Sequence, residues 1–301
     1  MNDTSNKVAF YILGSKGFST IKLFIDTYGS ESVSYIVFGI DKGVENDFSA
    51  EIKEIASKNS IRCFEKSGAL LEVEDKFLGW KFAIGWKWII DNTSQLIVLH
   101  DSLLPKYRGF SPLVNSLINR ETMIGVTALF ASSEYDKGEI IEQALLGIDY
   151  PMKIKELICR IEPLYFNLVN QIFSKIKKNI NITSKAQDEK QATYSLWLDK
   201  VDYFIDWSWS AEKIKRFVDA TGSPYDNAKS ALNGKIVKLV DVKVAKDVNI
   251  EIRERHIGKV VFMDRGNPTI ICGQGLLSIS TLLDNNNNNN NIKIDFRSRF
   301  E

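Results

Sequence analysis

The first half of the chain alternates short apolar runs with helix-like segments, and this alternation restricts the fold more than any other feature. Apolar runs typical of buried strands lie at residues 8–13, 33–40, 61–64, 82–85 and 96–100, and further β-rich runs lie at 125–131 and 139–148. Apolar side chains at helical spacing lie at residues 14–29, 48–58 and 154–176. Strands joined through helices make right-handed crossovers and pair in parallel. The sequence therefore predicts an α/β fold with a doubly wound, mostly parallel sheet.

The second half has a different pattern, which begins after the polar stretch 181–195 that we interpret as a linker. It opens with a helix at residues 211–220, which Ser210 can cap. Short strand-like runs separated by turns follow, and they predict a small β-barrel-like (OB-like) domain. We therefore expect two domains, at residues 1–185 and 195–301.

Charge and composition exclude several classes of protein. The 301 residues hold 39 Lys and Arg against 38 Asp and Glu, so the chain lacks the positive field of a general nucleic-acid binder. No stretch approaches the ~20 apolar residues of a membrane span, and the N-terminus lacks a signal-peptide pattern. We therefore expect a soluble, cytoplasmic protein that makes no membrane contact.

The cysteines and the low-complexity sequence do not indicate a reactive or metal-binding site. Cys63, Cys159 and Cys272 are far apart and form no CxxC motif, so the sequence predicts neither a disulfide framework nor a metal site. The asparagine run at residues 285–291 is expected to form a mobile surface loop. A homodimer is compatible with the sequence, which does not fix the oligomeric state.

Two polar residues at strand ends are candidates for catalysis. His100 ends the apolar run LIVLH, and the carboxyl ends of parallel strands are where ligands bind in open α/β sheets. Asp136 lies in a polar loop between two strand-like runs, where Gly138 permits a tight turn. A carboxylate beside an imidazole fixes its tautomer and favours its charged form. By position alone His100 can equally be structural and Asp136 an ordinary turn residue, so both alternatives stay open.

Taken together, the two loops resemble a known family. Residues 100–141 (HDSLLPKYRGFSPLVNSLINRETMIGVTALFASSEYDKGEII) resemble the folate-dependent formyltransferases, with a histidine opening an SLLP loop, a basic-glycine turn, a helix, a GVT strand and an Asp-x-Gly loop. Residues 204–242 resemble the start of that family's C-terminal β-barrel domain. The resemblance covers nearly the whole chain, in the two-domain arrangement of the tRNA and sugar-nucleotide formyltransferases.

The resemblance implies transfer of a formyl group from 10-formyltetrahydrofolate to a primary amine, with His100 and Asp136 as catalytic residues. It places these residues at the folate: Ile84, Gly85, Trp86, Lys87, Ser133, Glu134, Tyr135 and Gly138. It places these residues at the acceptor: Gly14, Ser15, Lys16, Ser102, Tyr107 and Arg108. Alternatives stay open: the tryptophans can be core aromatics, Gly14–Gly17 a plain strand-to-helix turn, and Arg108 a brace that pairs with a carboxylate.

The sequence departs from the family pattern beside the histidine. The family has an asparagine two residues before it, where this chain has Val98, and valine cannot donate a hydrogen bond to a developing oxyanion. The Ser102 hydroxyl and the Asn115 amide are candidate replacements. Asp101 replaces the usual proline after the histidine. Its carboxylate can share the role of His100, although we favour a loop-capping role.

The acceptor amine is suggested by the charge of one segment. The tRNA-specific branch of the family carries a basic loop after the second strand, but residues 41–54 hold five acidic residues against two lysines, which would repel phosphates. We therefore expect the primary amine of a nucleotide-linked amino-deoxysugar, used in surface-glycan synthesis, and no nucleic-acid partner. The alternatives are a methionyl-tRNA formyltransferase and a formyltransferase-like binding protein whose catalysis is impaired at Val98.

Overall fold

The computed structural model describes residues 7–66, 77–288 and 292–301. The first six residues, and residues 289–291 of the asparagine run, lie outside this description. The chain forms two compact units, the first made of residues 1–113, 122–148 and 156–196 and the second of 114–121, 149–155 and 197–301. Each unit has its own sheet, and we describe each by itself.

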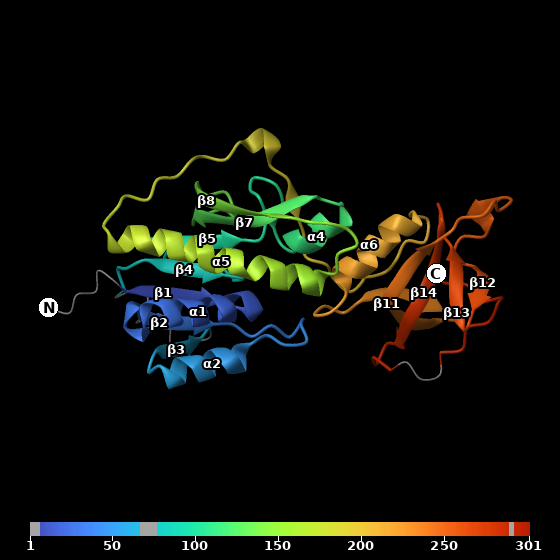
Figure 1. The fold of residues 1–301 in the computed structure, drawn as a ribbon, viewed down its shortest axis with the longest axis horizontal. Helices are drawn as coiled ribbons and strands as arrows, with labels where there is room; N and C mark the ends of the chain where they lie inside the picture. Colours follow the sequence, from blue (N-terminus) through green and yellow to red (C-terminus); the bar gives the residue numbers. More distant parts are fainter. Residues whose placement is uncertain (1–6, 67–76, 289–291) are drawn as a thin grey trace. The chain divides into compact units, whose positions relative to one another are not determined.

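The first unit is built on a seven-stranded sheet in the order β3-β2-β1-β4-β5-β7-β8 (Figure 1). Its strands are β1 (Val8–Ile12), β2 (Val33–Phe38), β3 (Arg62–Glu65), β4 (Lys81–Ile84), β5 (Leu96–His100), β7 (Met123–Phe130) and β8 (Ile140–Gly147). The five strands from β3 to β5 are parallel, whereas β7 and β8 are antiparallel to their neighbours. The predicted doubly wound, mostly parallel sheet is confirmed. Its direction of winding reverses between β1 and β4, where ligands bind in such sheets.

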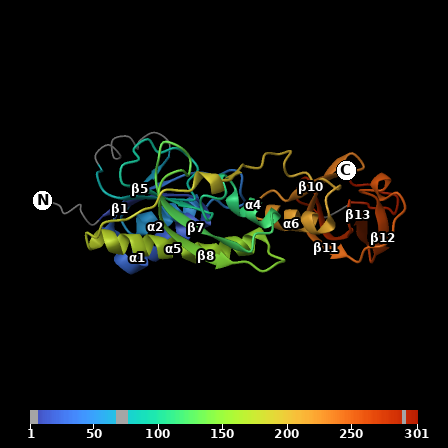
Figure 2. The ribbon, with the colours of Figure 1, turned by 90° about the horizontal axis from the view of Figure 1, so that it is seen from above.

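The helices of this part of the chain follow the predicted segments. They are α1 (Gly14–Tyr28), the short η2 (Ser30–Ser32), α2 (Ser49–Lys58), α4 (Pro112–Ile118) and α5 (Ile154–Lys177). In Figure 2, α1 and α5 lie on the same face of the sheet. Phe24 of α1 joins them, since its ring lies 4.9 Å from Phe10 of β1 and 4.8 Å from Phe173 of α5. The next residue of β1, Tyr11, points to the opposite face and contacts Trp86, because successive side chains alternate along a strand.

The polar stretch at residues 181–195 is ordered by the first unit, which corrects the linker interpretation. Lys185 exchanges two backbone hydrogen bonds with Ile140. The short η3 (Glu189–Gln191) follows, and then β9 (Tyr194–Ser195) pairs in parallel with β6 (Arg108–Gly109). Its polar composition reflects hydrogen bonding to other loops, which a sequence cannot distinguish from hydration.

The second unit is an antiparallel sheet packed against one helix. The helix is α6 (Ala211–Thr221), and Ser210 caps it as predicted, because its hydroxyl accepts from the Lys213 amide. The strands are β10 (Ala228–Leu232), β11 (Lys235–Ala245), β12 (Val260–Asp264), β13 (Asn267–Ile271) and β14 (Leu276–Asp284), in the order β10-β11-β14-β13-β12, with η4 (Arg253–Arg255) before β12.

The last residues of the chain make this sheet barrel-like. Phe300 bridges to Leu232 of β10, and Arg299 bridges to Lys259 beside β12, so the C-terminal segment connects the two edge strands. The ring of Phe300 is buried beside Trp207, whose indole nitrogen donates to Ser230. Closure of the edges satisfies backbone groups that an open sheet would expose.

Two features of the described residues bear on membranes and metals. Within residues 7–66, 77–288 and 292–301, no helix has the length and apolar character needed to cross a membrane. In the same ranges, no three His, Cys, Asp or Glu side chains are grouped so that they could hold a metal ion.

Candidate active site

A cavity of about 440 Å³ lies in the first unit, where the loops after β4 and β5 meet the loop that follows β7. Four segments line it, within residues 83–91, 93–101, 109–112 and 129–136. This volume is typical of a site for a small organic ligand. Both candidate catalytic residues, His100 and Asp136, lie in its wall.

His100 is held by contacts to both nitrogens of its ring. Nε2 lies 2.7 Å from the Tyr107 carbonyl oxygen, and Nδ1 lies 3.5 Å from Oδ1 of Asp136. A carbonyl oxygen only accepts, so Nε2 carries a proton and Nδ1 is the position where a proton can be gained or lost. The His100 ring is nearly buried, with 9% of its side chain exposed, so Nδ1 is shielded from bulk water.

Asp136 occupies a constrained position in the loop. Its backbone has φ 55°, in the left-handed region where aspartate is among the few tolerated residues. Oδ2 accepts from the Gly109 amide at 2.8 Å, which leaves Oδ1 facing His100. Gly138 is required two residues later, because a Cβ atom there would lie 1.7 Å from the Phe130 carbonyl oxygen. The structure thus brings together a histidine and an aspartate that are 36 residues apart in the sequence.

The loop after β4 contributes a mostly aromatic wall. Gly85, Trp86 and Lys87 line the cavity, whereas Ile84 is fully buried in the sheet. Gly85 has φ +62° and a Cβ there would lie 2.7 Å from the Leu13 carbonyl, so only glycine fits. Among the described residues, the buried indole Nε1 of Trp86 has no hydrogen-bond partner. That atom has almost no accessible surface, so the part of Trp86 that lines the cavity is apolar ring surface.

The loop before Asp136 forms the opposite wall. Ser133, Glu134 and Tyr135 line the cavity. Gly138 does not line it, and instead lets the loop backbone pass close to the Phe130 carbonyl. The ring of Tyr135, which is 53% exposed, packs 5.9 Å from Phe110.

The residues expected at the acceptor lie outside the cavity wall. This holds for Gly14, Ser15, Lys16, Ser102, Tyr107 and Arg108. Lys16 forms an ion pair with Asp101, which does line the cavity, so Asp101 binds a lysine instead of capping its loop. The Ser102 hydroxyl donates to the Lys106 carbonyl at 2.7 Å and is buried, which gives no support to its proposed role as an oxyanion donor.

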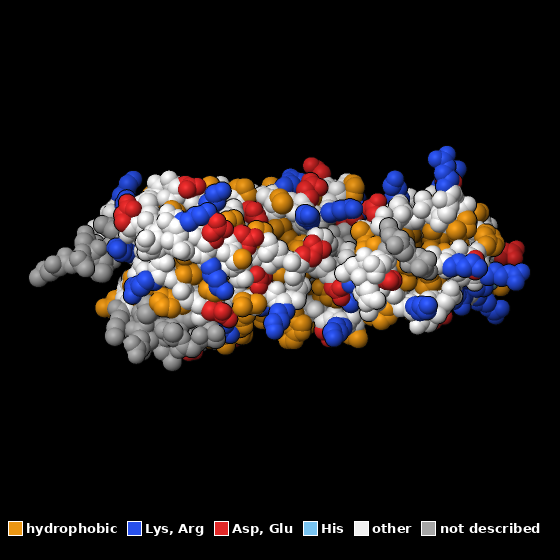
Figure 3. All heavy atoms as spheres, turned by 90° about the horizontal axis from the view of Figure 1, so that it is seen from below, with side chains coloured by type: hydrophobic (Ala, Val, Ile, Leu, Met, Phe, Trp, Pro, Cys, Tyr) orange, Lys and Arg blue, Asp and Glu red, His pale blue; other side chains and the backbone are white. Residues whose placement is uncertain are grey.

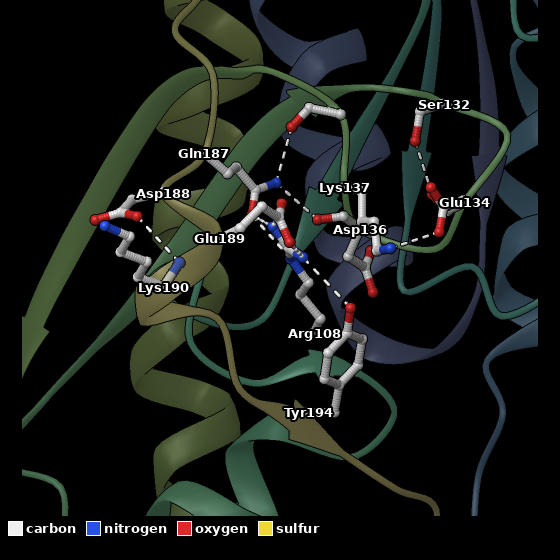
Figure 4. A network of polar contacts seen from close by, with 11 residues as sticks. Arg108, Ser132, Glu134, Asp136, Lys137, Gln187, Asp188, Glu189, Lys190 and Tyr194 are labelled. Carbon is white, nitrogen blue, oxygen red and sulfur yellow. Dashed lines mark hydrogen bonds and ion pairs between the residues drawn. The ribbon is translucent and has the colours of Figure 1, made fainter.

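Arg108 pairs with a protein carboxylate, which is the structural role that the sequence left open for it. Its side chain is fully buried and forms a bidentate pair with Glu189 at 2.9 and 2.7 Å. It also donates twice to Oε1 of Gln187, at 3.0 and 2.8 Å, and stacks over Tyr194 (Figure 4). The hydrogen bonds between the guanidinium and the carboxylate lower the pKa of Glu189 and raise that of Arg108.

Val98 lies in the cavity wall two residues before His100, so the departure from the family pattern falls inside the site. The side chain supplies apolar surface where a donor was expected. Asn115 belongs to the second unit, and its role as a replacement donor stays a prediction.

Comparisons with known proteins agree with this arrangement. A sequence model described as "Formyl transferase" matches residues 80–164, and one described as "Formyl transferase, C-terminal domain" matches residues 198–294. The chain belongs to the formyl transferase family. The match to the first model includes His100, Asp136 and the walls of the cavity.

Sequence relatives of this chain include proteins named methionyl-tRNA formyltransferase. That of Thermotoga neapolitana is 34% identical over 184 residues, which are 61% of this chain and 56% of the relative. That of Syntrophomonas wolfei is 28% identical over 183 residues, which are 61% of this chain and 57% of the relative. The alignments thus span little more than half the length of these relatives.

Solved structures share the fold of this formyl transferase at low identity. An N-formyltransferase from Helicobacter canadensis, in complex with folinic acid and dTDP-3-aminofucose, superposes with a TM-score of 0.67 at 17% identity, over 91% of this chain and 98% of that one. HypX from Aquifex aeolicus has a TM-score of 0.60 at 18% identity, over 83% of this chain and 44% of that one.

Several site residues of the formyl transferase were not found from the sequence. Phe110 and Ser111 line the cavity through a loop whose course depends on the whole sheet. Gln187 and Glu189 lie in the supposed linker, and no local pattern marks them, because their partners are about 50 to 80 residues away. A charged side chain inside a polar stretch gives no signal of its own.

Proposed function

We propose that this chain transfers a formyl group from 10-formyltetrahydrofolate to a primary amine. The observation that carries the proposal is the contact between His100 and Asp136 in the wall of a cavity, in a chain of the formyl transferase family. Both residues follow strands of one sheet, so a rigid element supports them.

The His100–Asp136 pair can carry out the proton transfers that formyl transfer requires. The attacking nitrogen must lose one proton, and the departing nitrogen must gain one. His100 Nδ1 or Asp136 Oδ1 can hold that proton between these two events. The two atoms are 3.5 Å apart, which is longer than an ordinary hydrogen bond, so they do not bind each other tightly. A third group, the reacting nitrogen or oxygen, can therefore compete for the proton. Acid–base help of this type contributes ~100- to 10,000-fold in rate.

The cavity has the composition that a flat, heteroaromatic co-substrate needs. Trp86 and Trp88 provide aromatic surface on one side, and Gly85 lets backbone groups approach a ring closely. Gly85, Trp86 and Lys87 would hold the folate from one side, and Ser133, Glu134 and Tyr135 from the other.

Val98 leaves the site without the expected hydrogen-bond donor to the oxyanion, which affects the rate of the proposed reaction. Loss of one oxyanion donor costs about 3–4 kcal/mol in enzymes where it has been removed. The chain therefore works more slowly than members with the asparagine, or another donor acts in its place. A formyltransferase-like binding protein without turnover is the outcome if neither holds.

For the acceptor we propose the primary amine of a nucleotide-linked amino-deoxysugar. The support is the acidic segment at residues 41–54, which would repel a phosphate backbone. Asp41 in this segment pairs with Lys87 at 2.8 Å, beside the cavity, so an acidic side chain offsets the lysine's charge there.

A methionyl-tRNA formyltransferase is the second candidate, and two observations favour it. The sequence relatives carry that name. In the face shown in Figure 3, Lys and Arg side chains outnumber acidic ones on the second unit. Exposed basic residues of this unit include Arg255, Arg265, Arg297 and Arg299. A basic surface of this kind suits phosphate contacts.

A turnover assay distinguishes these acceptors. The full chain is incubated with 10-formyltetrahydrofolate and either a panel of nucleotide-linked amino-deoxysugars or charged initiator tRNA, and tetrahydrofolate release is followed together with formylated product. We expect one sugar to be formylated with a weak dependence on salt. Formylation of the tRNA, with a rate that falls steeply as salt rises, contradicts the sugar assignment. No turnover with any acceptor, despite folate binding, contradicts the enzyme assignment.

A further inference from the structure

We propose that Gln187 is a positioning residue that holds Asp136 against His100, and that the segment 185–195, which we name the strap, exists to support this contact. The inference rests on the proposed formyl transfer for its kinetic consequences. Its structural part stands on the hydrogen bonds of the strap alone. Figure 4 shows how Gln187 lies between Arg108 and the loop that carries Asp136.

The Gln187 amide connects the strap to the loop that carries Asp136. Its Nε2 donates to the Asp136 carbonyl at 2.7 Å and to the Gly138 carbonyl at 2.8 Å. These two acceptors flank the left-handed turn at Asp136, a conformation that costs free energy and persists only when its surroundings fix it. One amide group therefore secures both sides of the turn that aims the carboxylate at His100.

Arg108 binds the oxygen of the same Gln187 side-chain amide. Its guanidinium donates twice to Gln187 Oε1 and twice to the Glu189 carboxylate, and it is fully buried. With Oε1 occupied by these donors, the NH₂ group of Gln187 must face the two carbonyls. The buried arginine thus fixes the orientation of Gln187, and Glu189 balances its charge.

The strap also holds the groups that contact His100 and Asp136 from the other side. The Tyr107 carbonyl accepts from His100, and the Tyr107 amide donates to the Thr193 hydroxyl at 2.9 Å. The Gly109 amide donates to Asp136, and Gly109 pairs with Ser195 of the strap. The Tyr107 carbonyl and the Gly109 amide, which bind His100 and Asp136, therefore both lie in the short segment 107–109 that the strap supports.

The kinetic test uses three variants. Gln187→Ala removes both donors, and Gln187→Glu keeps an acceptor for Arg108 but places a carboxylate against two carbonyls. Gln191→Ala is the matched control, because Gln191 lies on the same strap, is exposed, and bonds with its side chain to Asp188. We expect both Gln187 variants to lower kcat about tenfold or more, with KM for folate within twofold, because small displacements of a reacting group are costly. The control should match the wild type.

A double-variant comparison separates positioning from general structural damage. If Gln187 acts through Asp136, Gln187→Ala should change kcat by less than twofold in an Asp136→Asn background. The same loss of kcat in both backgrounds, or a wild-type kcat in Gln187→Ala, overturns the proposal.

Hydrogen exchange tests the strap without reference to activity. Backbone amides of residues 131–139 should exchange faster in Gln187→Ala than in the wild type, and Gln191→Ala should leave them unchanged. Unchanged exchange in Gln187→Ala overturns the proposal even if the enzyme is active. Faster exchange in a chain that formylates nothing supports the positioning role and contradicts the proposed function alone.

Discussion

The two histidines of this chain lie in very different surroundings. His100 ends a strand of the parallel sheet, lines the cavity and has a carboxylate beside Nδ1. His256 follows the short helix η4 in the second unit, and its Nδ1 lies 3.0 Å from the Lys259 ammonium. Because an ammonium group only donates, Nδ1 of His256 is an acceptor there.

This difference shows that the group that contacts a histidine ring, more than the ring itself, decides which proton transfers the ring can take part in. A carboxylate can only accept a hydrogen bond from the neighbouring nitrogen, whereas a lysine ammonium can only donate one to it. Parallel strands collect their carboxyl ends at one edge, so loops from several strands can meet at His100. His256 lies beside a turn that supports an antiparallel sheet, and its backbone amide bonds to Arg253 within that turn.

The largest effect is expected from His100→Ala. We expect kcat/KM to fall ~100- to 10,000-fold, because the proton relay is lost. Steady-state turnover measures the effect, and far-UV circular dichroism checks that the variant folds. Turnover close to that of the wild type would remove the functional distinction between the two histidines.

The next largest effect is expected from Asp136→Asn. The side-chain oxygen can still accept from the Gly109 amide, but the charge beside His100 disappears. We expect kcat to fall ~100-fold and its pH dependence to change, because a neutral amide replaces the carboxylate beside the imidazole. A pH–rate profile with the wild-type shape would show that the carboxylate does not act on the imidazole.

Val98→Asn tests whether the site lacks a donor. An amide in the cavity wall would restore a hydrogen bond to the developing oxyanion, and we expect kcat to rise about tenfold, part of the effect of such donors. Single-turnover kinetics measure the change, with Val98→Leu as the control that enlarges the side chain without adding a donor. A lower or unchanged kcat in a folded variant means that another group already supplies the donor.

The smallest effect is expected from His256→Ala. The side chain is partly exposed, and its removal should change the free energy of unfolding by about 0.5 kcal/mol or less and leave turnover unchanged. Thermal unfolding and the turnover assay measure both quantities. A loss of activity comparable to that of His100→Ala would assign His256 a role that its surroundings do not suggest.

Much of the fold could be predicted from local patterns. Buried parallel strands are continuous apolar runs, so Val8–Ile12 and Leu96–His100 were found almost to the residue. The helices α1 and α6 were found from apolar spacing and from their terminal residues. The capping of α6 by Ser210 needs only three neighbouring residues, so the sequence alone determines it.

The candidate site was predicted only in part. His100 and Asp136 were found because each follows a strand and because together they match a family pattern. Two of the residues expected at the acceptor lie outside the cavity wall for a shared reason. Lys16 and Arg108 carry charges that bind protein carboxylates, Asp101 and Glu189, and a sequence does not show which charges are already paired.

What the sequence by itself determined is therefore the set of strands and helices, the doubly wound sheet and the two residues at its strand ends. Only the tertiary structure decided that residues 185–195 form a strap, that Gln187 supports Asp136, and that Val98 faces the cavity. Periodicity and capping act between near neighbours in the chain, so a sequence displays them. Hydrogen bonds between residues 50 or more apart depend on how the loops pack, which no local pattern records.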